Sequence, residues 1–162
     1  MRDGIWKMVG NIRAMTEGRR PDQFNDAELK HLEFIQSVIA RLANNSFLLK
    51  GWSVTLVAAI LALTVRDSSI YPMFLALFPA LVFWGLDAFY LAQERHFRKM
   101  HEDARAGKIA VLSMDPYTYE SGFRGWFGSV KSRSVFPFHV VIVAVVILAA
   151  VVQALSVGGT GN

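Results

Sequence analysis

Cysteine is absent from the 162 residues of this chain, and charged residues are few, at 19% of the total. The absence of cysteine excludes disulfide bonds, thiolate metal ligands and a cysteine nucleophile. Asp, Glu, Lys and Arg are also missing from long stretches, the longest of which runs from Ser134 to the end of the chain. The hydrophobic residues, 53% of the total, therefore gather in blocks, a pattern that is typical of a membrane protein.

Three of these blocks are long enough to cross a bilayer, whose hydrocarbon core takes about 20 apolar helical residues. They run from about Phe47 to Val65, from Ile70 to about Ala92, and from Val135 to Val157. The third block contains no formally charged residue, whereas the first contains Lys50 and the second Asp87. The predicted fold class is an all-α integral membrane protein with three transmembrane helices.

The distribution of Lys and Arg predicts how these helices are oriented. Seven basic residues precede the first block and eight lie between the second and the third, whereas the turn between the first two contains only Arg66. The tail after the third block is uncharged. Because Lys and Arg favour the cytoplasmic side, we expect a cytoplasmic N-terminus, a cytoplasmic loop between the second and third helices, and an external C-terminus. No signal peptide or lipidation motif is visible at the start.

The first two helices are expected to continue beyond the membrane. Asn25 is a predicted N-cap with Glu28 three residues later, which is the spacing of a capping box. No Gly or Pro follows before Gly51, and the second helix continues through charged residues to a predicted cap at Gly107. The two extensions predict a long hairpin that projects about 20–30 Å into the cytoplasm.

The chain divides into five expected segments. These are a cytoplasmic amphipathic N-terminal segment (1–24), the helical hairpin with two transmembrane spans (25–106), a cytoplasmic interfacial loop (107–134), the third transmembrane helix (135–157) and a tail (158–162). Basic residues mixed with an aromatic residue beside a span favour lipid headgroups. The interfacial loop contains four such residues: Arg124, Trp126, Lys131 and Arg133.

Two pairs of opposite charges fall at matched depths in the predicted hairpin. Lys50 lies 16 residues before Arg66, and Asp87 lies 17 residues after Ile70. Arg41 and Glu94, nearer the cytoplasm, are matched in the same way. For Lys50 and Asp87 three interpretations stay open, namely a structural ion pair, snorkelling of each side chain to the headgroups, and a role in ion conduction or gating.

Other polar residues are less distinctive. A helix-packing polar layer is expected from Asn44, Asn45 and Ser46, where the first helix enters the bilayer, with ordinary interfacial chemistry as the alternative. His139 lies near the inner end of the third helix, and we interpret it as a packed or interfacial histidine, with a proton relay as the alternative. The four histidines lack metal-ligand spacing, and no catalytic residue, metal site, cofactor or nucleic-acid interface is predicted.

Several stretches resemble a widespread family of small bacterial membrane proteins of unknown function. They are Leu32–Gln36, Asn45–Trp52, Phe78–Asp87 and Gln93–Arg98. The chain is also similar, more loosely, to RipA-like octameric and SLATT-type membrane proteins. This resemblance covers residues 25–106 and implies a helical hairpin with cytoplasmic extensions in the bacterial inner membrane. SLATT-type proteins are suspected pore-forming effectors, but their plan has two spans and this chain has three predicted spans.

Two hypotheses about function follow. The first is a non-enzymatic, homo-oligomeric inner-membrane protein that forms a pore or disrupts the membrane, with Lys50, Asp87, Asn44 and Asn45 at the cytoplasmic mouth. The second is a membrane scaffold or regulatory subunit whose cytoplasmic helices dock a soluble partner. The expected partners are therefore the lipid bilayer, further copies of the chain and a soluble cytoplasmic protein.

Overall fold

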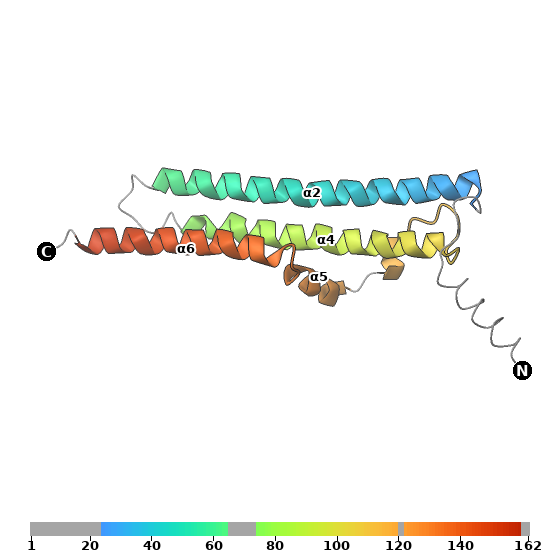
Figure 1. The fold of residues 1–162 in the computed structure, drawn as a ribbon. Coiled ribbons are helices and arrows are strands. Elements are labelled where there is room, and N and C mark those ends of the chain that lie inside the picture. The colour runs from blue at the N-terminus through green and yellow to red at the C-terminus, as the bar shows by residue number, and fades with distance from the viewer. Residues whose placement is uncertain (1–23, 65–73, 120–121, 160–162) are drawn as a thin grey trace, which may run out of the picture.

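The computed structural model describes residues 24–64, 74–119 and 122–159, and every regular element within them is helical (Figure 1). The elements are α2 (Asp26–Thr64), α4 (Leu77–Arg105), the 3-10 helix η2 (Pro116–Tyr119), α5 (Gly122–Val130) and α6 (Phe136–Gly159). The predicted all-α class is confirmed. The amphipathic N-terminal segment, the predicted hairpin turn with the start of the second span, and the last three residues lie outside the described residues.

The ends of the first two helices are formed by the residues that the sequence predicts. The Asn25 amide donates to Glu28 Oε2 at 2.9 Å, and the Glu28 amide donates to Asn25 Oδ1 at 2.8 Å, which completes a capping box. After Arg105 the chain turns at Gly107, whose φ of 68° is in the left-handed region. The Gly107 and Lys108 amides bond to the carbonyls of Ala104 and Asp103, so α4 ends in a Schellman motif.

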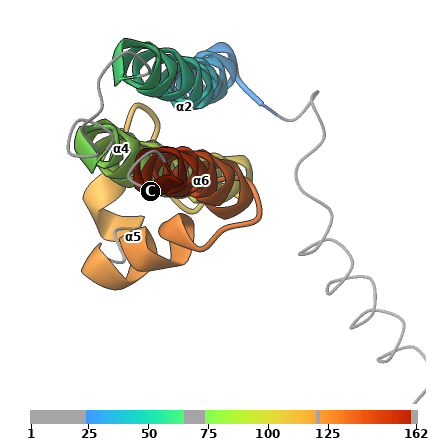
Figure 2. The ribbon, with the colours of Figure 1, turned by 90° about the vertical axis from the view of Figure 1, so that its left-hand side faces the viewer.

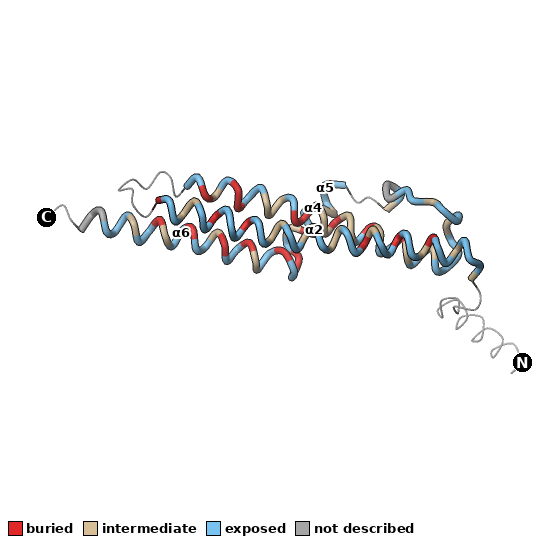
Figure 3. Tube along the Cα trace, turned by 90° about the horizontal axis from the view of Figure 1, so that it is seen from above, coloured by how far each residue is buried: buried red, intermediate tan, exposed pale blue. Residues whose placement is uncertain are grey.

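The three long helices lie side by side along one axis. α2 and α4 run antiparallel over most of their length, and α6 lies against one half of that pair (Figures 1 and 2). The short helix α5 packs on α4 beside the first turn of α6. Buried residues follow the inward-facing side of each helix, and exposed residues cover the outside (Figure 3).

Two separate apolar clusters divide the molecule along its length. One contains Val57 of α2, Ala80 of α4 and Val146 of α6. The other contains Ile35 and Ile39 of α2 with Met100 of α4. The apolar half consists of α2 from residue 47 onward, α4 up to residue 92, and α6. The charged arm consists of residues 26–43 of α2 together with residues 93–119.

Two of the described helices are long and apolar enough to cross a membrane, namely α2 and α6. The second predicted span, from Ile70 to Ala92, begins outside the described residues, and its described part starts at Leu77. That part continues without a break into the charged half of α4, so the helix as described is less apolar than its two neighbours. A third span stays a prediction.

Candidate functional site

Asp87, near the middle of α4, is fully enclosed by the protein. Its side chain has no exposed surface, and it is the one buried Asp, Glu, Lys or Arg among the described residues. Transfer of a carboxylate from water to a buried position is costly unless charged and hydrogen-bonding partners surround it. The partners of Asp87 therefore identify the residues that make this position possible.

Those partners come from both of the other long helices. Lys50 Nζ of α2 lies 2.8 Å from Asp87 Oδ1 and 2.7 Å from Oδ2. Ser46, one turn earlier on α2, donates its hydroxyl to Oδ1 and accepts a hydrogen bond from Lys50 Nζ at 3.0 Å. His139 Nε2 of α6 lies 3.0 Å from Oδ2. We call Ser46, Lys50, Asp87 and His139 the Asp87 cluster, and it joins all three helices.

The local sequence explains why α2 contributes two groups to this cluster. Ser46 and Lys50 are four residues apart, so they share one helical face. His139 reaches the cluster from the first turn of α6, whose start is held by Ser132. The Ser132 carbonyl accepts a hydrogen bond from the Phe136 amide at 2.9 Å, and its hydroxyl accepts one from the Val135 amide at 3.3 Å.

His139 is enclosed as completely as Asp87. Its ring stacks on Trp84, with centroids 5.9 Å apart and planes 8° from parallel. An ionised carboxylate only accepts hydrogen bonds, so His139 Nε2 is the donor to Asp87. His139 Nδ1 is buried without a hydrogen-bond partner among the described residues, and so is Ser53 Oγ of α2, three residues along from Lys50.

Two tryptophans fasten α5 to α4 beside this cluster. Trp126 Nε1 donates to the Gly85 carbonyl at 3.1 Å, and Trp84 Nε1 donates to the Val130 carbonyl at 3.3 Å. A Cβ atom at Gly85 would stand 3.6 Å from Trp126 Cζ2, an ordinary contact. Because α6 follows α5 in the chain, these bonds help to set where α6 begins.

The structure brings Lys50 and Asp87 together but not Arg41 and Glu94. Glu94 Oε1 is bound by Arg98 Nη2 at 2.7 Å on the same helix, whereas Arg41 is exposed. Arg41 lies two residues after Ile39, which is buried against α4, and two residues turn an α-helix by about 200°. The depth count matched the two residues in height, but Arg41 faces away from α4.

The other predicted site residues are spread over several environments. Within the expected polar layer, Ser46 is part of the Asp87 cluster, Asn45 is half-buried and Asn44 is exposed. Among the expected headgroup residues, three are exposed and the fourth is half-buried against α4. The exposed residues are Arg124, Lys131 and Arg133, and the half-buried one is Trp126.

The charged arm has its own polar contacts at the end farthest from α6. His31 Nε2 lies 2.9 Å from the Ser113 carbonyl, and Tyr119 donates its hydroxyl to Asp103 Oδ2 at 2.9 Å. Lys108 Nζ is 3.1 Å from Asp103 Oδ1. The hydrogen bond from Lys108, together with that from Tyr119, lowers the pKa of Asp103. Loss of solvation, and then the bond to Asp103, raises the pKa of Tyr119.

The Asp87 cluster is suited to balancing charge between helices. Ser46 donates to a carboxylate that Lys50 and His139 also bind, so its hydroxyl is held as a donor. No group of three His, Asp or Glu side chains in the described ranges is arranged to hold a metal ion. Sequence reasoning did not assign His139 and Trp84 to this site. The available signal was that His139 is the single titratable residue of the third predicted span.

Comparison with models of protein families, with curated proteins and with solved structures found no match for this chain. The resemblance to a family of small bacterial membrane proteins therefore stays a prediction.

Proposed function

We propose that this chain is a non-enzymatic protein of the bacterial inner membrane that crosses the bilayer three times. In this proposal the charged arm projects into the cytoplasm and acts as a scaffold or regulatory subunit for a soluble partner. One observation carries it: in the apolar half the charged groups are enclosed within the chain and the outer surface is apolar. Such a surface suits contact with lipid on every side. Binding of a soluble partner is therefore assigned to the charged arm.

The exposed side chains support placing the apolar half in lipid. In α2 from residue 47, α4 to residue 92 and α6 to residue 156, the exposed side chains are apolar except for Thr55 and Ser156. Both hydroxyls donate to carbonyls of their own helices, Thr55 to Gly51 at 3.0 Å and Ser156 to Gln153 at 2.8 Å. Asp87 of the middle helix is neutralised from inside, so its charge is no obstacle to crossing the bilayer.

The charged arm supports the docking role because it combines its own core with an exposed aromatic residue. Ile35, Ile39 and Met100 are buried between α2 and α4 at this end. Phe34, on the outer side of α2, is 58% exposed. It borders a cavity of about 420 Å³ that Lys30 and Glu33 also line. Aromatic side chains are enriched at protein–protein interfaces, so Phe34 is the residue of this surface that we expect a partner to contact.

Topology can be tested with single cysteines, because the chain has none of its own. Met114→Cys is placed in the arm, and Ser156→Cys is placed near the far end of α6. A thiol reagent that does not cross membranes should label Ser156→Cys in intact cells and Met114→Cys only after permeabilisation. Labelling of both variants in intact cells would contradict the three-span arrangement.

Partner docking can be tested by placing a photo-crosslinking amino acid at Phe34 in cells. The matched control is the same amino acid at Leu63, which is 80% exposed in the apolar half. The scaffold proposal expects one reproducible soluble polypeptide at Phe34 and none at Leu63. Crosslinks at Phe34 to lipid or to copies of the chain alone would overturn the docking role.

The pore-forming alternative is favoured by one feature, an apolar groove between α2 and α6. The groove has a volume of about 230 Å³, and Ala58 and Val141 are among the residues that line it. Most of its lining residues are Val, Leu or Ile, and the small residue Ala58 would allow close approach of a helix from a second copy at that point. A pore assembled on these faces would have largely apolar walls, which is why we rank it second. An oligomer in detergent, lost in Ala58→Leu, together with ion flux in liposomes would reverse this ranking.

A further inference from the structure

A cavity of about 350 Å³ opens between α4 and α5, at the level along the molecule where the apolar half meets the charged arm. Basic side chains of α4 form one wall and small residues of α5 form the other. The residues that matter here are Arg95, His96, Arg98, Lys99, Gly128 and Ser129. We call this space the α4–α5 cavity. It is separate from the Asp87 cluster, with which it shares no residue.

The wall on α4 offers many hydrogen-bond donors and carries positive charge. Arg95, Arg98 and Lys99 line the cavity, and none of its described lining residues is acidic. Glu94, on the same helix, binds Arg98 through Nε at 2.8 Å and Nη2 at 2.7 Å, so it offsets one of the three charges. A guanidinium group has five donors and an ammonium group has three, so donors remain after these bonds.

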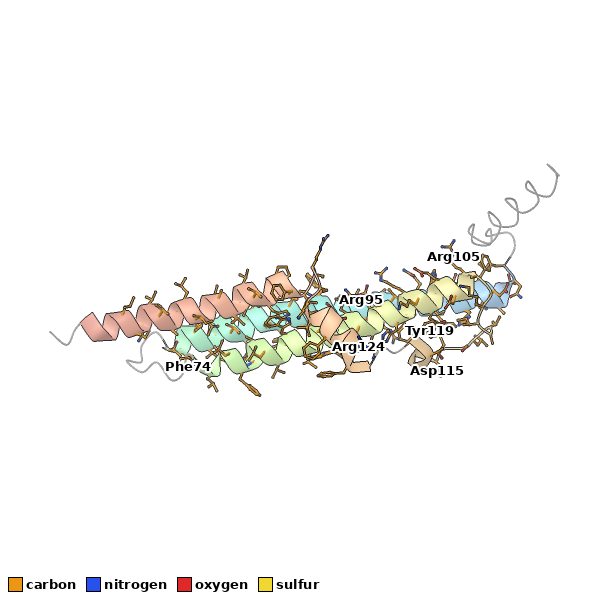
Figure 4. All side chains as sticks on the ribbon, turned by 90° about the horizontal axis from the view of Figure 1, so that it is seen from below. Phe74, Arg95, Arg105, Asp115, Tyr119 and Arg124 are labelled. Carbon is orange, nitrogen blue, oxygen red and sulfur yellow. The ribbon has the colours of Figure 1, made fainter. Side chains whose placement is uncertain are left out.

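Arg95 is held in place at the junction of the two walls. Its Nη1 donates to Ser129 Oγ at 3.2 Å, and Ser129 Oγ in turn donates to the Gly125 carbonyl at 3.1 Å. Ser129 is fully buried. Figure 4 labels Arg95 at the level of the molecule where α5 packs on α4. A guanidinium group fixed in this way loses less entropy when it binds an anion.

Glycine leaves part of the opposite wall, formed by α5, free of side chains. A Cβ atom built on Gly128 would meet no other atom within 4 Å, so the space in front of it is open. The aromatic residues Phe123 and Phe127 of the same helix are exposed, at 71% and 45%. A cationic cavity beside exposed aromatic rings matches the boundary between phosphate groups and acyl chains in a bilayer.

We propose that the α4–α5 cavity binds a phosphate group through Arg95, Arg98 and Lys99. Arginine and lysine are the side chains that bind phosphate oxygens best, through charge-assisted hydrogen bonds. Two sources offer this group, the phosphodiester of an anionic phospholipid and a soluble phosphate ester. The lipid source rests on the proposed membrane placement, whereas the soluble source does not.

The test uses the purified full chain in detergent. Native mass spectrometry counts bound phosphatidylglycerol against zwitterionic phosphatidylcholine, and calorimetry measures binding of glycerol 3-phosphate and inorganic phosphate. The double variant Arg95→Gln/Lys99→Gln removes two cations of the cavity. Its matched control, Arg41→Gln/Arg105→Gln, removes two exposed cations of the charged arm that do not line the cavity. Gly128→Leu adds a bulky side chain to the α5 wall without any change in charge.

The phosphate-bearing ligand that binds should lose at least about tenfold in affinity in both cavity variants, because hydrogen bonds between charged groups are lost or blocked. The control should lose less than about threefold. Preference for phosphatidylglycerol identifies the lipid source, and binding of glycerol 3-phosphate identifies the soluble one. Equal losses of affinity in the cavity and control variants would overturn the proposal. So would the absence of binding by phosphatidylglycerol, glycerol 3-phosphate and inorganic phosphate. If Arg95→Gln/Lys99→Gln does not fold, Gly128→Leu decides the outcome.

If cysteine labelling contradicts the three-span arrangement, the measurements with glycerol 3-phosphate and inorganic phosphate still test the cavity. Conversely, loss of phosphate binding leaves the topology and docking experiments unaffected. The two proposals can therefore fail independently.

Discussion

His139 Nε2 lies 3.0 Å from Asp87 Oδ2, although 52 residues separate the two in the chain. This contact attaches α6 to α4, while Lys50 attaches α2 to the same carboxylate. One buried charge therefore has a partner on each neighbouring helix. Replacement of any member should destabilise the packing of all three helices. The loss should be larger where a charged group, rather than a neutral one, is left buried without a partner.

Asp87→Asn should destabilise the fold by about 3–5 kcal/mol, because it leaves the ammonium group of Lys50 in a largely enclosed site without its counter-charge. Unfolding in mixed detergent micelles measures this free energy. Glu94→Gln is the control, since it removes an ion pair with the exposed Arg98 and should cost less than about 1 kcal/mol. Adding Lys50→Met to Asp87→Asn should restore part of the loss. An additive result would show that the two residues do not stabilise each other.

His139→Phe should cost about 1–3 kcal/mol, because it removes a hydrogen-bond donor from a buried carboxylate. His139→Gln keeps a donor and should cost less than His139→Phe. The same unfolding measurement applies, and cysteine crosslinking between α4 and α6 reports whether α6 stays in place. A smaller loss in His139→Phe than in His139→Gln would mean that ring packing on Trp84 matters more than the bond to Asp87.

Gly107→Ala should destabilise the end of α4 by about 1–2 kcal/mol, since an L-residue with a side chain is disfavoured at its φ of 68°. Hydrogen exchange of the amides of Gly107 and Lys108, which close the Schellman motif, should become faster. Gly51→Ala is the matched control. Gly51 is inside α2 with open space around it, so the substitution should stabilise the helix by about 0.5–1 kcal/mol. Similar destabilisation by both substitutions would contradict this assignment.

The charged arm should lose stability in acid at Asp103. The folded-state pKa of this carboxyl is lowered from 3.8, so its contribution is complete above that value and is lost as the pH falls through the folded-state pKa. The raised pKa of Tyr119 has the opposite sign, so its contribution is complete below 10.0 and is lost as the pH rises through the folded-state pKa.

Tyr119→Phe should therefore raise the pKa of Asp103 toward 3.8, which NMR titration of the carboxyl carbon can measure. Lys108→Gln should do the same, because Lys108 makes the larger contribution. Tyr90→Phe, a substitution in the apolar half, is the control and should leave the titration of Asp103 unchanged. An unchanged titration in Tyr119→Phe would show that the hydroxyl is bonded elsewhere in solution.

Much of the local structure could be predicted from short stretches of sequence. The capping box at Asn25 and Glu28 and the turn at Gly107 each depend on residues within one or two helical turns. Lys50 and Asp87 were matched by their similar depths, counted from the predicted hairpin turn, and the structure brings those two residues together. The same count failed for Arg41 and Glu94, because depth along a helix does not specify the face on which a residue lies.

The sequence by itself determined the long helices, the caps at Asn25 and Gly107 and the level at which Lys50 and Asp87 lie, because these follow from hydrophobic periodicity and short-range hydrogen bonds. It did not predict η2 and α5, which lie within the expected interfacial loop. Only the tertiary structure decided which faces meet, and it therefore decided that His139 completes the Asp87 cluster and that Arg41 is left outside. The position of α6 depends on α5, which Trp126 ties to the carbonyl of Gly85. Such long-range contacts arise from the packing of the whole molecule, and no local pattern specifies them.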